Sequence, residues 1–446
     1  MNMEDNNSRC CDVLVIGGGP AGSTVSTFLK QAGHDVVLLE KDQHPRFHIG
    51  ESMLPFSLPI FKRLGVLEKV HSIGVVKKGV DFNYHKSKIG TKWGWFADVG
   101  DGVNYAYQVH RAQLDEILIN NAAEKGVTVL QRTEATEVTF GDDDTITVVR
   151  SRSADGKEVT WRPKFVVDAT GRDTLLSGRY LHSKQAHASH RSAAMFAHCA
   201  GVPRREGDRE GNISMYWFDH GWVWMIPLQG DVMSVGAVCS PEYLKTRGGR
   251  KEAFFWETLK LMPDANERMT NATLKSEVTF TGNYSYFSKK MFGNNYLLVG
   301  DAYAFLDPVW SSGVLVAMKS AEKSSTLIDR WLKREASATG LFGPYKKWVD
   351  NGISQYGWFI FRFRTPFFRG MWMRDVKQTK MVARIDLALA TFLSGNVFDY
   401  HEGMSGLRYF KTIYYAIYAL NRALSAVGIV RLIKAMRDRK AEPAGA

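Results

Sequence analysis

The chain has 446 residues, 45% of them hydrophobic, which is enough for two or three domains or for one large core with an appendage. No run reaches about 18 uninterrupted apolar residues, so the sequence predicts no transmembrane segment. The formal net charge of +12 favours anionic partners, although a solvated basic surface explains it equally well. We expect no nucleic-acid partner.

The cysteines and the N-terminal residues indicate the cellular compartment in which the protein is expected. The four cysteines, at positions 10, 11, 199 and 239, match neither a disulfide framework nor the spacing of a metal site. The first nine residues include acidic side chains and no apolar run, so they do not resemble a secretory signal. We therefore expect a cytoplasmic protein without a metal site.

The N-terminal stretch predicts a nucleotide-binding βαβ unit. Residues 12–16 form a short apolar run typical of a buried parallel strand, and Glu40 ends a second such strand. Between the two strands, Gly17, Gly19 and Gly22 spell G-x-G-x-x-G. These glycines allow, in turn, a tight turn, close approach of a pyrophosphate, and packing of a helix on the strand. Because the helix N-terminus favours negative charge and Glu40 has the spacing of a ribose-binding acid, the unit predicts an adenosine diphosphate site.

Helical, strand-like and polar segments follow in chain order. A polar loop at 45–52 precedes helical periodicity over 54–76, and strand-like segments follow at 75–84 and 92–107. A helix is predicted over 108–125, and short strands over 127–130, 134–140 and 145–149. Buried strands at 165–168 and 295–299 end in polar turns, and residues 193–279 read as aromatic antiparallel strands. A loop at 306–313 leads into a helix of about 15 residues, and a helical region rich in aromatic and basic residues begins near residue 342.

These patterns predict an α/β fold with three parts. The first is a discontinuous Rossmann-type nucleotide-binding domain, over 10–80, 105–190 and 280–335. The second is an inserted antiparallel β-sheet that binds the substrate, over 81–104 and 191–279, and the third is a C-terminal helical region, over 336–446. We expect the aromatic stripe of the helical region to pack on the body of the protein; docking to a membrane surface or a partner is the alternative.

Three buried strands that each end in a nucleotide-type turn make the chain resemble the FAD-dependent aromatic monooxygenase superfamily. The turns are 17–22, 168–171 and 300–301. The resemblance implies that FAD is the cofactor, that the D-A-T-G turn lies on the cofactor side of the sheet, that Asp301 binds the ribose or ribityl region, and that Arg111 lies near the flavin. The cofactor-binding residues predicted in this way are Gly17, Gly19, Pro20, Ala21, Gly22, Glu40, Lys41, Arg46, Ser52, Arg111 and Asp301.

Three further segments resemble the flavin-dependent halogenases. Residues 222–227 read W-V-W-M-I-P and match the W-x-W-x-I-P signature of that family, while 46–52 resemble its R-x-x-x-G-E-S segment and 307–313 its D-P-x-x-S-S-G loop. Two indoles at this spacing project from one face of a strand. The resemblance implies that they keep the organic substrate away from the flavin. The substrate-separating residues implied are Trp222, Trp224, Ile226, Pro227 and Trp310.

The implied activity is halogenation in natural-product biosynthesis. Reduced FAD from a separate flavin reductase, together with O2 and chloride or bromide, yields hypohalous acid. The backbone N–H groups of Ser312 and Gly313 would hold the halide, because a loop that enters a helix is a favourable anion site. A lysine would then direct the hypohalous acid, by hydrogen bonding or as a haloamine, onto an electron-rich aromatic ring.

Two adjacent lysines are candidates for this role. Residues 77–82 read K-K-G-V-D-F and fit the related pattern K-x-G-a-x-F with Lys77 as the first residue. Because neighbouring side chains of a strand face opposite sides, only one of the two can face the pocket. We predict that Lys77 is catalytic and that Lys78 faces solvent; two surface lysines are the alternative.

At one position the chain differs from the tryptophan-type halogenases in a way that concerns the substrate. Tryptophan-type halogenases carry a glutamate where this chain has Trp310. The chain therefore resembles the branch that acts on pyrroles and phenols, several members of which take a substrate tethered to an acyl or peptidyl carrier protein. Such a carrier is acidic, which is compatible with the positive net charge. The expected partners are a flavin reductase and a small aromatic substrate, free or carrier-bound.

Two other readings stay open. An FAD-dependent aromatic hydroxylase, or a reductase of the isoprenoid type, would use the same fold without needing the lysine. A non-enzymatic, flavin-binding protein of the membrane surface would instead be organised by the aromatic C-terminal helices.

Overall fold

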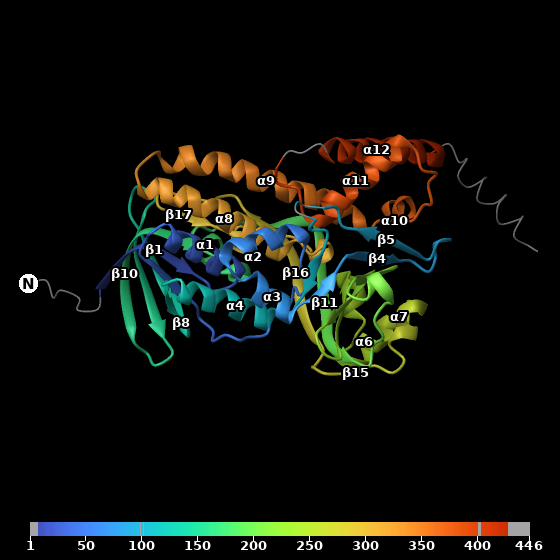
Figure 1. The fold of residues 1–446 in the computed structure, drawn as a ribbon, viewed down its shortest axis with the longest axis horizontal. Coiled ribbons are helices and arrows are strands. Elements are labelled where there is room, and N and C mark those ends of the chain that lie inside the picture. Colours follow the sequence, from blue (N-terminus) through green and yellow to red (C-terminus); the bar gives the residue numbers. More distant parts are fainter. Residues whose placement is uncertain (1–7, 99, 101, 400–402, 427–446) are drawn as a thin grey trace, which may run out of the picture.

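The computed structural model describes residues 8–426 except 99, 101 and 400–402. Two large sheets stand side by side, one carrying the predicted nucleotide-binding unit and the other the aromatic strands (Figure 1). The mixed α/β fold predicted from the sequence is confirmed. Residues 427–446 of the predicted C-terminal region lie outside the described part of the chain.

The first sheet has seven strands in the order β7-β2-β1-β10-β9-β8, with β17 paired to β10. The strands β1 (Ser8–Ile16), β2 (Val36–Leu39), β7 (Thr128–Leu130), β10 (Glu158–Asp168) and β17 (Tyr296–Leu298) run parallel, and β8 (Thr133–Phe140) and β9 (Ile146–Ser153) are antiparallel. Helix α1 (Pro20–Gln31) packs against α4 (Arg111–Glu124) and α8 (Gly313–Leu332). Because β1, β10 and β17 are neighbours, the turns that follow them converge at one edge of the sheet.

The second sheet has nine strands in the order β18-β16-β11-β14-β13-β12-β4-β5, with β15 paired to β11. They are β4 (Gly79–Asn83), β5 (Thr91–Trp95), β11 (Lys184–Ala200), β12 (Ile213–Phe218), β13 (Gly221–Leu228), β14 (Val232–Cys239), β15 (Thr273–Leu274), β16 (Thr279–Ser288) and β18 (Ala304–Phe305). The pairing is antiparallel as predicted, apart from β4 and β12, which run parallel. A separate two-stranded sheet joins β3 (Val75–Lys77) to β6 (Ala106–Gln108).

Alternating side chains of β13 belong to different cores. Trp222, Trp224 and Ile226 pack in the cluster shared with the C-terminal helices, whereas Val223 and Met225 pack in a cluster with the helices that follow β14. This is the period of two that a strand imposes on its side chains. The two indoles therefore share one face of the strand.

Three helices interrupt the segment predicted to be wholly β-rich. They are α5 (Pro241–Lys245), α6 (Lys251–Leu259) and α7 (Pro263–Arg268). Ser240 caps α5 through its side-chain oxygen, which accepts from the N–H of Tyr243. The aromatic content of 193–279 favoured strands, but the apolar residues of α6 recur at helical spacing and bury Phe254, Phe255 and Leu259. The strand prediction was wrong for these helices because it relied on the aromatic composition of the segment and not on the helical spacing of its apolar residues.

Two element boundaries also differ from the prediction. The strand expected over 75–84 is two strands in different sheets, β3 and β4, with Lys78 between them. Helix α8 has 20 residues rather than about 15. Upstream, the helical periodicity of 54–76 becomes η1 (Pro55–Ser57), α2 (Leu58–Leu64) and α3 (Leu67–Ile73), with Gly65 and Gly74 at the ends of the two α-helices.

The C-terminal region is helical and covers part of the second sheet (Figure 1). It comprises α9 (Ala338–Phe363), α10 (Pro366–Trp372), α11 (Lys380–Ser394) and α12 (Gly403–Ala426). Its aromatic residues pack inward: the ring of Phe363 lies 4.6 Å from that of Trp217, on β12. Within the described residues, no helix is long and apolar enough to cross a membrane.

Candidate active site

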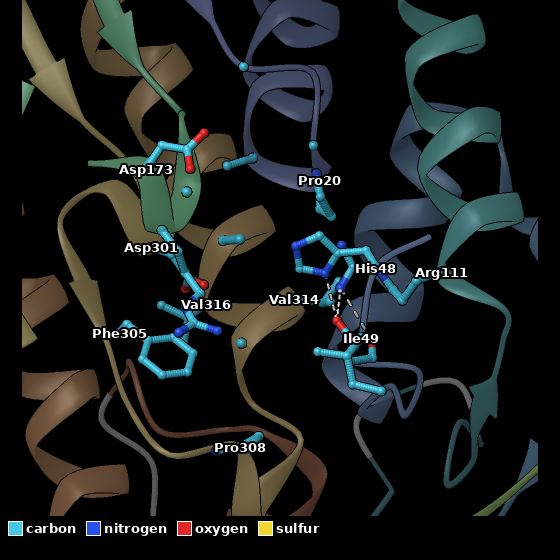
Figure 2. A pocket seen from close by; sticks show the side chains of 18 of the residues that line it. Pro20, His48, Ile49, Arg111, Asp173, Asp301, Phe305, Pro308, Val314 and Val316 are labelled. Atoms are coloured by element: carbon cyan, nitrogen blue, oxygen red, sulfur yellow. Dashed lines mark hydrogen bonds between the residues drawn. The ribbon is translucent and has the colours of Figure 1, made fainter. Parts of the chain in front are cut away.

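A cavity of about 770 Å³ lies at the edge of the first sheet where its nucleotide turns converge, and it extends to the face of the second sheet. Figure 2 shows its lining, with Pro20 opposite Asp301 and Phe305. Most of the predicted site residues line it: Gly17, Gly19, Pro20, Ala21, Glu40, Lys41, Arg46, Ser52, Arg111, Trp222, Trp224, Ile226, Asp301, Ser312 and Gly313. Gly22, Lys77, Pro227 and Trp310 are not part of the lining.

The glycine turn forms the nucleotide end of the cavity. Gly17 has φ +104°, and a Cβ there would lie 2.4 Å from the carbonyl oxygen of Ala169. A Cβ on Gly22 would lie 1.8 Å from the carbonyl oxygen of Gly17, so Gly22 serves packing rather than the lining. Nothing lies within 4 Å of a Cβ on Gly19, where α1 is about to begin. The open backbone at Gly19 beside a helix N-terminus is a cradle that a pyrophosphate fits.

Charged side chains surround this turn. The buried carboxylate of Glu40 accepts hydrogen bonds from the backbone N–H of Gly18, at 2.6 Å, and of Asp42, at 2.8 Å. Arg46 approaches Glu40 with 3.9 Å between Nη2 and Oε2. Lys41 pairs with Asp173, which also lines the cavity. Glu40 thus fixes the turn and presents its carboxylate at the position expected for a ribose ligand.

Two aspartates follow the neighbouring strands and differ in what they do. Asp168, at the end of β10, accepts from Thr170 and from the backbone N–H of Leu176, so it holds its own turn in place while Ala169 and Gly171 line the cavity. Asp301 faces the cavity directly, and burial raises the pKa of its carboxyl to about 6. A hydroxyl-rich ligand would supply the hydrogen bonds that such a buried carboxylate requires.

Arg111 ties the loop at 46–52 to helix α4. Its Nε and Nη2 each donate to Asp115 at 2.9 Å. Its Nη1 donates to the carbonyl oxygen of Ile49 at 3.0 Å (Figure 2). Beside it, burial lowers the pKa of His48 to about 4. This loop is therefore a fixed wall of the cavity that carries a neutral imidazole.

The paired indoles close the cavity on the side of the second sheet. Trp222 and Trp224 are 2% and 5% exposed, with ring centroids 5.7 Å apart. Trp224 lies across Gly236 on the neighbouring strand, where a Cβ would come within 2.2 Å of the indole. Its Nε1 donates to Ser234 at 3.2 Å. Pro227 does not join this wall, because its place in the strand puts it on the opposite face from Ile226.

The loop before α8 lines the same cavity as these indoles. Ser311 adopts φ +54°, Ser312 is buried at the N-cap position, and α8 begins at Gly313 and runs for 20 residues. The free N–H groups of the first turn of a long helix favour an anion. Ser312 and Gly313 both line the cavity, so an anion there would lie inside it.

The two candidate lysines have opposite environments. Lys77 is fully buried, and its Nζ donates to Ser52 Oγ at 2.8 Å and to the carbonyl oxygen of Met53 at 3.1 Å. Phe96 lies 5.1 Å from the ammonium. Burial lowers the pKa of Lys77 to about 7. Lys78 is exposed and pairs with Asp208.

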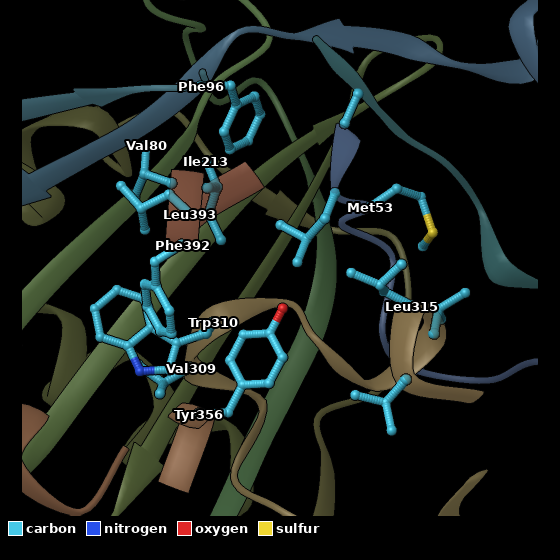
Figure 3. Packing of buried hydrophobic residues seen from close by; sticks show 14 of the residues in the cluster. Met53, Val80, Phe96, Ile213, Val309, Trp310, Leu315, Tyr356, Phe392 and Leu393 are labelled. Carbon is cyan, nitrogen blue, oxygen red and sulfur yellow. The ribbon is translucent and has the colours of Figure 1, made fainter. Parts of the chain in front are cut away.

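Lys77 stands behind the cavity wall rather than in it. Ser52 lines the cavity and accepts the hydrogen bond from the lysine, so one side chain separates the two. Beyond Lys77 lies an apolar cluster that contains Met53, Phe96 and Tyr356, and Figure 3 shows the hydroxyl of Tyr356 between Trp310 and Leu315. That hydroxyl is buried and has no hydrogen-bond partner within the described residues.

Trp310 lies in the same apolar cluster and not at the cavity. Its ring is 5.0 Å from Phe363, 5.5 Å from Phe392 and 5.8 Å from Trp372. Its partners come from the C-terminal helices, whose packing on this loop the sequence pattern did not reveal. Trp310 therefore does not line the cavity, although the ring of Phe363 packs against both Trp310 and Trp222.

One group of polar residues was missed by the sequence analysis. Glu51, His110 and His198 come from three distant segments, and their side chains meet beside the cavity. Spacing along the chain gives no sign of this group. A signal was present only in Glu51, which lies inside the recognised R-x-x-x-G-E-S segment.

Comparisons with known proteins identify the family of the chain. The tryptophan halogenase family profile matches residues 12–100 and 95–364. A tryptophan 2-halogenase of Chondromyces crocatus is 34% identical over 350 residues, which cover 76% of this chain and 66% of that protein. A 1H-pyrrole-2-carbonyl-[peptidyl-carrier protein] chlorinase of Pseudomonas fluorescens is 29% identical over 374 residues, covering 78% and 82% of the two chains. The solved structure of the flavin-dependent brominase Bmp2 superimposes with a TM-score of 0.80 at 26% identity, covering 93% of this chain and all of that one.

The chain therefore belongs to the tryptophan halogenase family. Its relatives are named flavin-dependent halogenases, which are FAD-dependent oxidoreductases, so the resemblance inferred from the sequence motifs is confirmed. The chain spans about two thirds of the length of the Chondromyces relative.

Proposed function

We propose that the protein is a flavin-dependent halogenase that makes hypohalous acid at FAD and passes it to Lys77, which directs it onto an electron-rich aromatic ring. The observation that carries this proposal is the position of Lys77: a buried amine with a pKa near 7, one side chain behind the wall of the cofactor cavity. An amine of ordinary pKa would be almost wholly protonated at neutral pH.

The cavity residues fit FAD. Gly19 and the N-terminus of α1 would hold the pyrophosphate, Glu40 the ribose of the adenosine, and Asp301 the hydroxyls nearer the flavin. When bound and reduced, FAD would give two electrons to O2 and the halide would give two more, so that one oxygen atom ends in hypohalous acid and the other in water. A separate flavin reductase is the expected source of the reduced cofactor.

The halide site is assigned to the backbone of Ser312 and Gly313. Their position at the start of α8 supports this, because the helix dipole and the free N–H groups favour an anion there. Chloride and bromide both suit such a site. The adjoining indoles of Trp222 and Trp224 would exclude an organic substrate from this end of the cavity.

Lys77 would receive the hypohalous acid past Ser52, the side chain that lies between it and the cavity. Its neutral amine can displace water from the acid and become a haloamine, while its protonated form can hold the acid by a hydrogen bond and polarise it. Phe96 and the carbonyl of Met53 fix the side chain, so the reactive nitrogen keeps one position. The aromatic substrate then attacks the halogen and loses a proton.

The substrate class follows from the surroundings of Lys77. The described residues around it are apolar and aromatic, and Trp310 occupies the position of the glutamate of tryptophan-type enzymes. A pyrrole or phenol activates its own ring and needs no carboxylate to assist it. The pyrrole chlorinase among the relatives acts on a carrier-bound substrate, which makes a carrier protein a reasonable partner for this basic chain.

Mass spectrometry tests the proposal. A phenol and a carrier-bound pyrrole would be incubated with the protein, FAD, a flavin reductase and bromide, and products would be searched for the bromine isotope doublet. We expect a brominated product whose yield falls by about 100-fold or more in Lys77→Ala. The Lys78→Ala variant is the matched control, because that neighbouring ammonium is exposed and pairs with Asp208.

Other products would change the assignment. A product heavier by one oxygen, formed equally by Lys77→Ala, would make the protein a hydroxylase of the same fold. Equal loss of bromination in both lysine variants would remove the directing role from Lys77.

A further inference from the structure

One carboxylate and two imidazoles converge beside the cofactor cavity without a role in the reaction described above. Glu51 lies in the loop at 46–52, His110 directly precedes α4, and His198 is on β11. A ligand atom from each lies within 4.8 Å of the other two. His198 Nε2 is 2.8 Å from Glu51 Oε1, and the two imidazole rings lie 5.5 Å apart at 79° to each other.

The carboxylate of Glu51 is only half satisfied. The residue is 1% exposed, and its Oε2 has no hydrogen-bond partner within the described part of the chain. The nearby cation Arg111 already donates to Asp115 and to the carbonyl of Ile49. A buried oxygen left unpaired in this way costs about 1–3 kcal/mol or more. The site thus lacks a cation that the chain itself does not supply.

His110 and His198 each offer a ring nitrogen to the cluster. One nitrogen of each imidazole lies within 4.8 Å of the other ligand atoms. His110 stands at the N-cap position of α4, which fixes the place of its backbone. His198 is anchored separately, since its backbone N–H donates to Ser276 Oγ at 3.0 Å.

We propose that Glu51, His110 and His198 form a binding site for a divalent metal ion of the zinc class. Two imidazoles and one carboxylate are a common donor set for Zn²⁺, with water completing the coordination. Both histidines are partly exposed, so an ion can enter from solvent while Glu51 reaches it from the cavity side. The ion would tie the loop at 46–52 to β11 and to the start of α4. This site is independent of the halogenase proposal, and neither depends on the other.

Titration with Co²⁺ tests the site directly, because a four- or five-coordinate Co²⁺ absorbs strongly in the visible range. The full-length protein, freed of metal with a chelator, would be titrated with Co²⁺ and then with Zn²⁺ as competitor. We expect one equivalent to bind and Zn²⁺ to displace it. Glu51→Gln and His198→Ala should each weaken metal binding by more than about 100-fold. Removing a residue that only hydrogen-bonds to a metal ligand lowers affinity by about 10- to 100-fold, and removing the ligand itself should cost more.

The His34→Ala variant is the matched control. His34 Nε2 is 2.8 Å from Asp329 Oδ1, a histidine–carboxylate pair like that of His198 and Glu51 but outside the cluster. It should leave Co²⁺ binding unchanged. If Glu51→Gln fails to fold, His110→Ala and His198→Ala serve in its place, because both side chains are partly exposed. The absence of saturable binding to the wild-type chain, or binding that persists in the ligand variants, would overturn the proposal.

Discussion

The two ends of the cavity are built on different principles. At the nucleotide end, the wall is formed by backbone. Gly17 and Gly22 lie where a side chain would clash, and Gly19 leaves the backbone surface open. At the other end, side chains form the wall: Trp222 and Trp224 fill space, and Lys77 is buried behind Ser52. The first end depends on the absence of atoms, and the second on how completely water is excluded. They should therefore fail in different ways.

The largest effect is expected at the nucleotide end. Gly17→Val places a Cβ 2.4 Å from the carbonyl of Ala169 at a φ of +104°, which a β-branched residue cannot adopt without strain. We expect FAD affinity to fall by more than about 1,000-fold, or about 4 kcal/mol. Quenching of flavin fluorescence on titration measures it.

Gly343→Ala controls for the loss of a glycine. This residue lies in α9, and nothing lies within 4 Å of an added Cβ. Its FAD affinity should equal that of the wild type. A wild-type affinity in Gly17→Val would mean that the turn does not bind the pyrophosphate.

The next effect is expected at Lys77 and concerns stability. Burial lowers the pKa of this lysine from 10.5 to about 7, so the unfolded chain binds a proton more readily than the folded one. The charge therefore destabilises the fold fully below pH 7, and the penalty fades as pH rises from 7 towards 10.5. We expect Lys77→Met to raise the free energy of unfolding by about 2–3 kcal/mol at neutral pH, while abolishing directed halogenation.

Urea unfolding at several pH values checks this prediction. The gain from Lys77→Met should shrink above neutral pH, and Lys78→Met should give no gain, because Lys78 is exposed. A gain that does not depend on pH would show that burial does not lower the pKa of Lys77, because stability would then have no proton linkage at this residue.

The same difference between the two ends of the cavity determines how much of the site could be predicted from the sequence. The glycine turn, Glu40 and the strands around them were predictable because one short segment encodes the whole arrangement. The placement of Trp310 was not, because its neighbours Phe363, Phe392 and Trp372 come from helices far along the chain. The domain boundaries and the roles of individual site residues stay predictions.

The same contrast explains why one group of polar residues was overlooked. Glu51, His110 and His198 are separated by 59 and 88 positions, and only the convergence of a loop, a helix start and a strand brings them together. Motif reading detects residues that act within one segment. It cannot detect a site made by tertiary contact alone.

The smallest effect is expected at Ser312. If the backbone N–H groups hold the halide, Ser312→Ala keeps them and removes only a hydroxyl. We expect the bromide concentration for half-maximal rate to change by no more than about threefold, less than the effect of losing a hydrogen bond to a charged group. Steady-state kinetics against bromide measures it. A change of about 100-fold would mean that the side chain, not the backbone, binds the anion.

The fit of Trp224 over Gly236 sets a rule for redesigning the wall. The indole occupies the space that any side chain at position 236 would need, so the two positions on adjacent strands share one fixed volume. A larger residue at 236 is compatible only with a smaller one at 224. An added Cβ at 236 would also lie 2.7 Å from the Cβ of Phe196 on the other neighbouring strand, so a smaller residue at 224 does not by itself make room. A library that varies position 224 while keeping Gly236 is therefore the one that can move the barrier between cofactor and substrate without breaking the sheet.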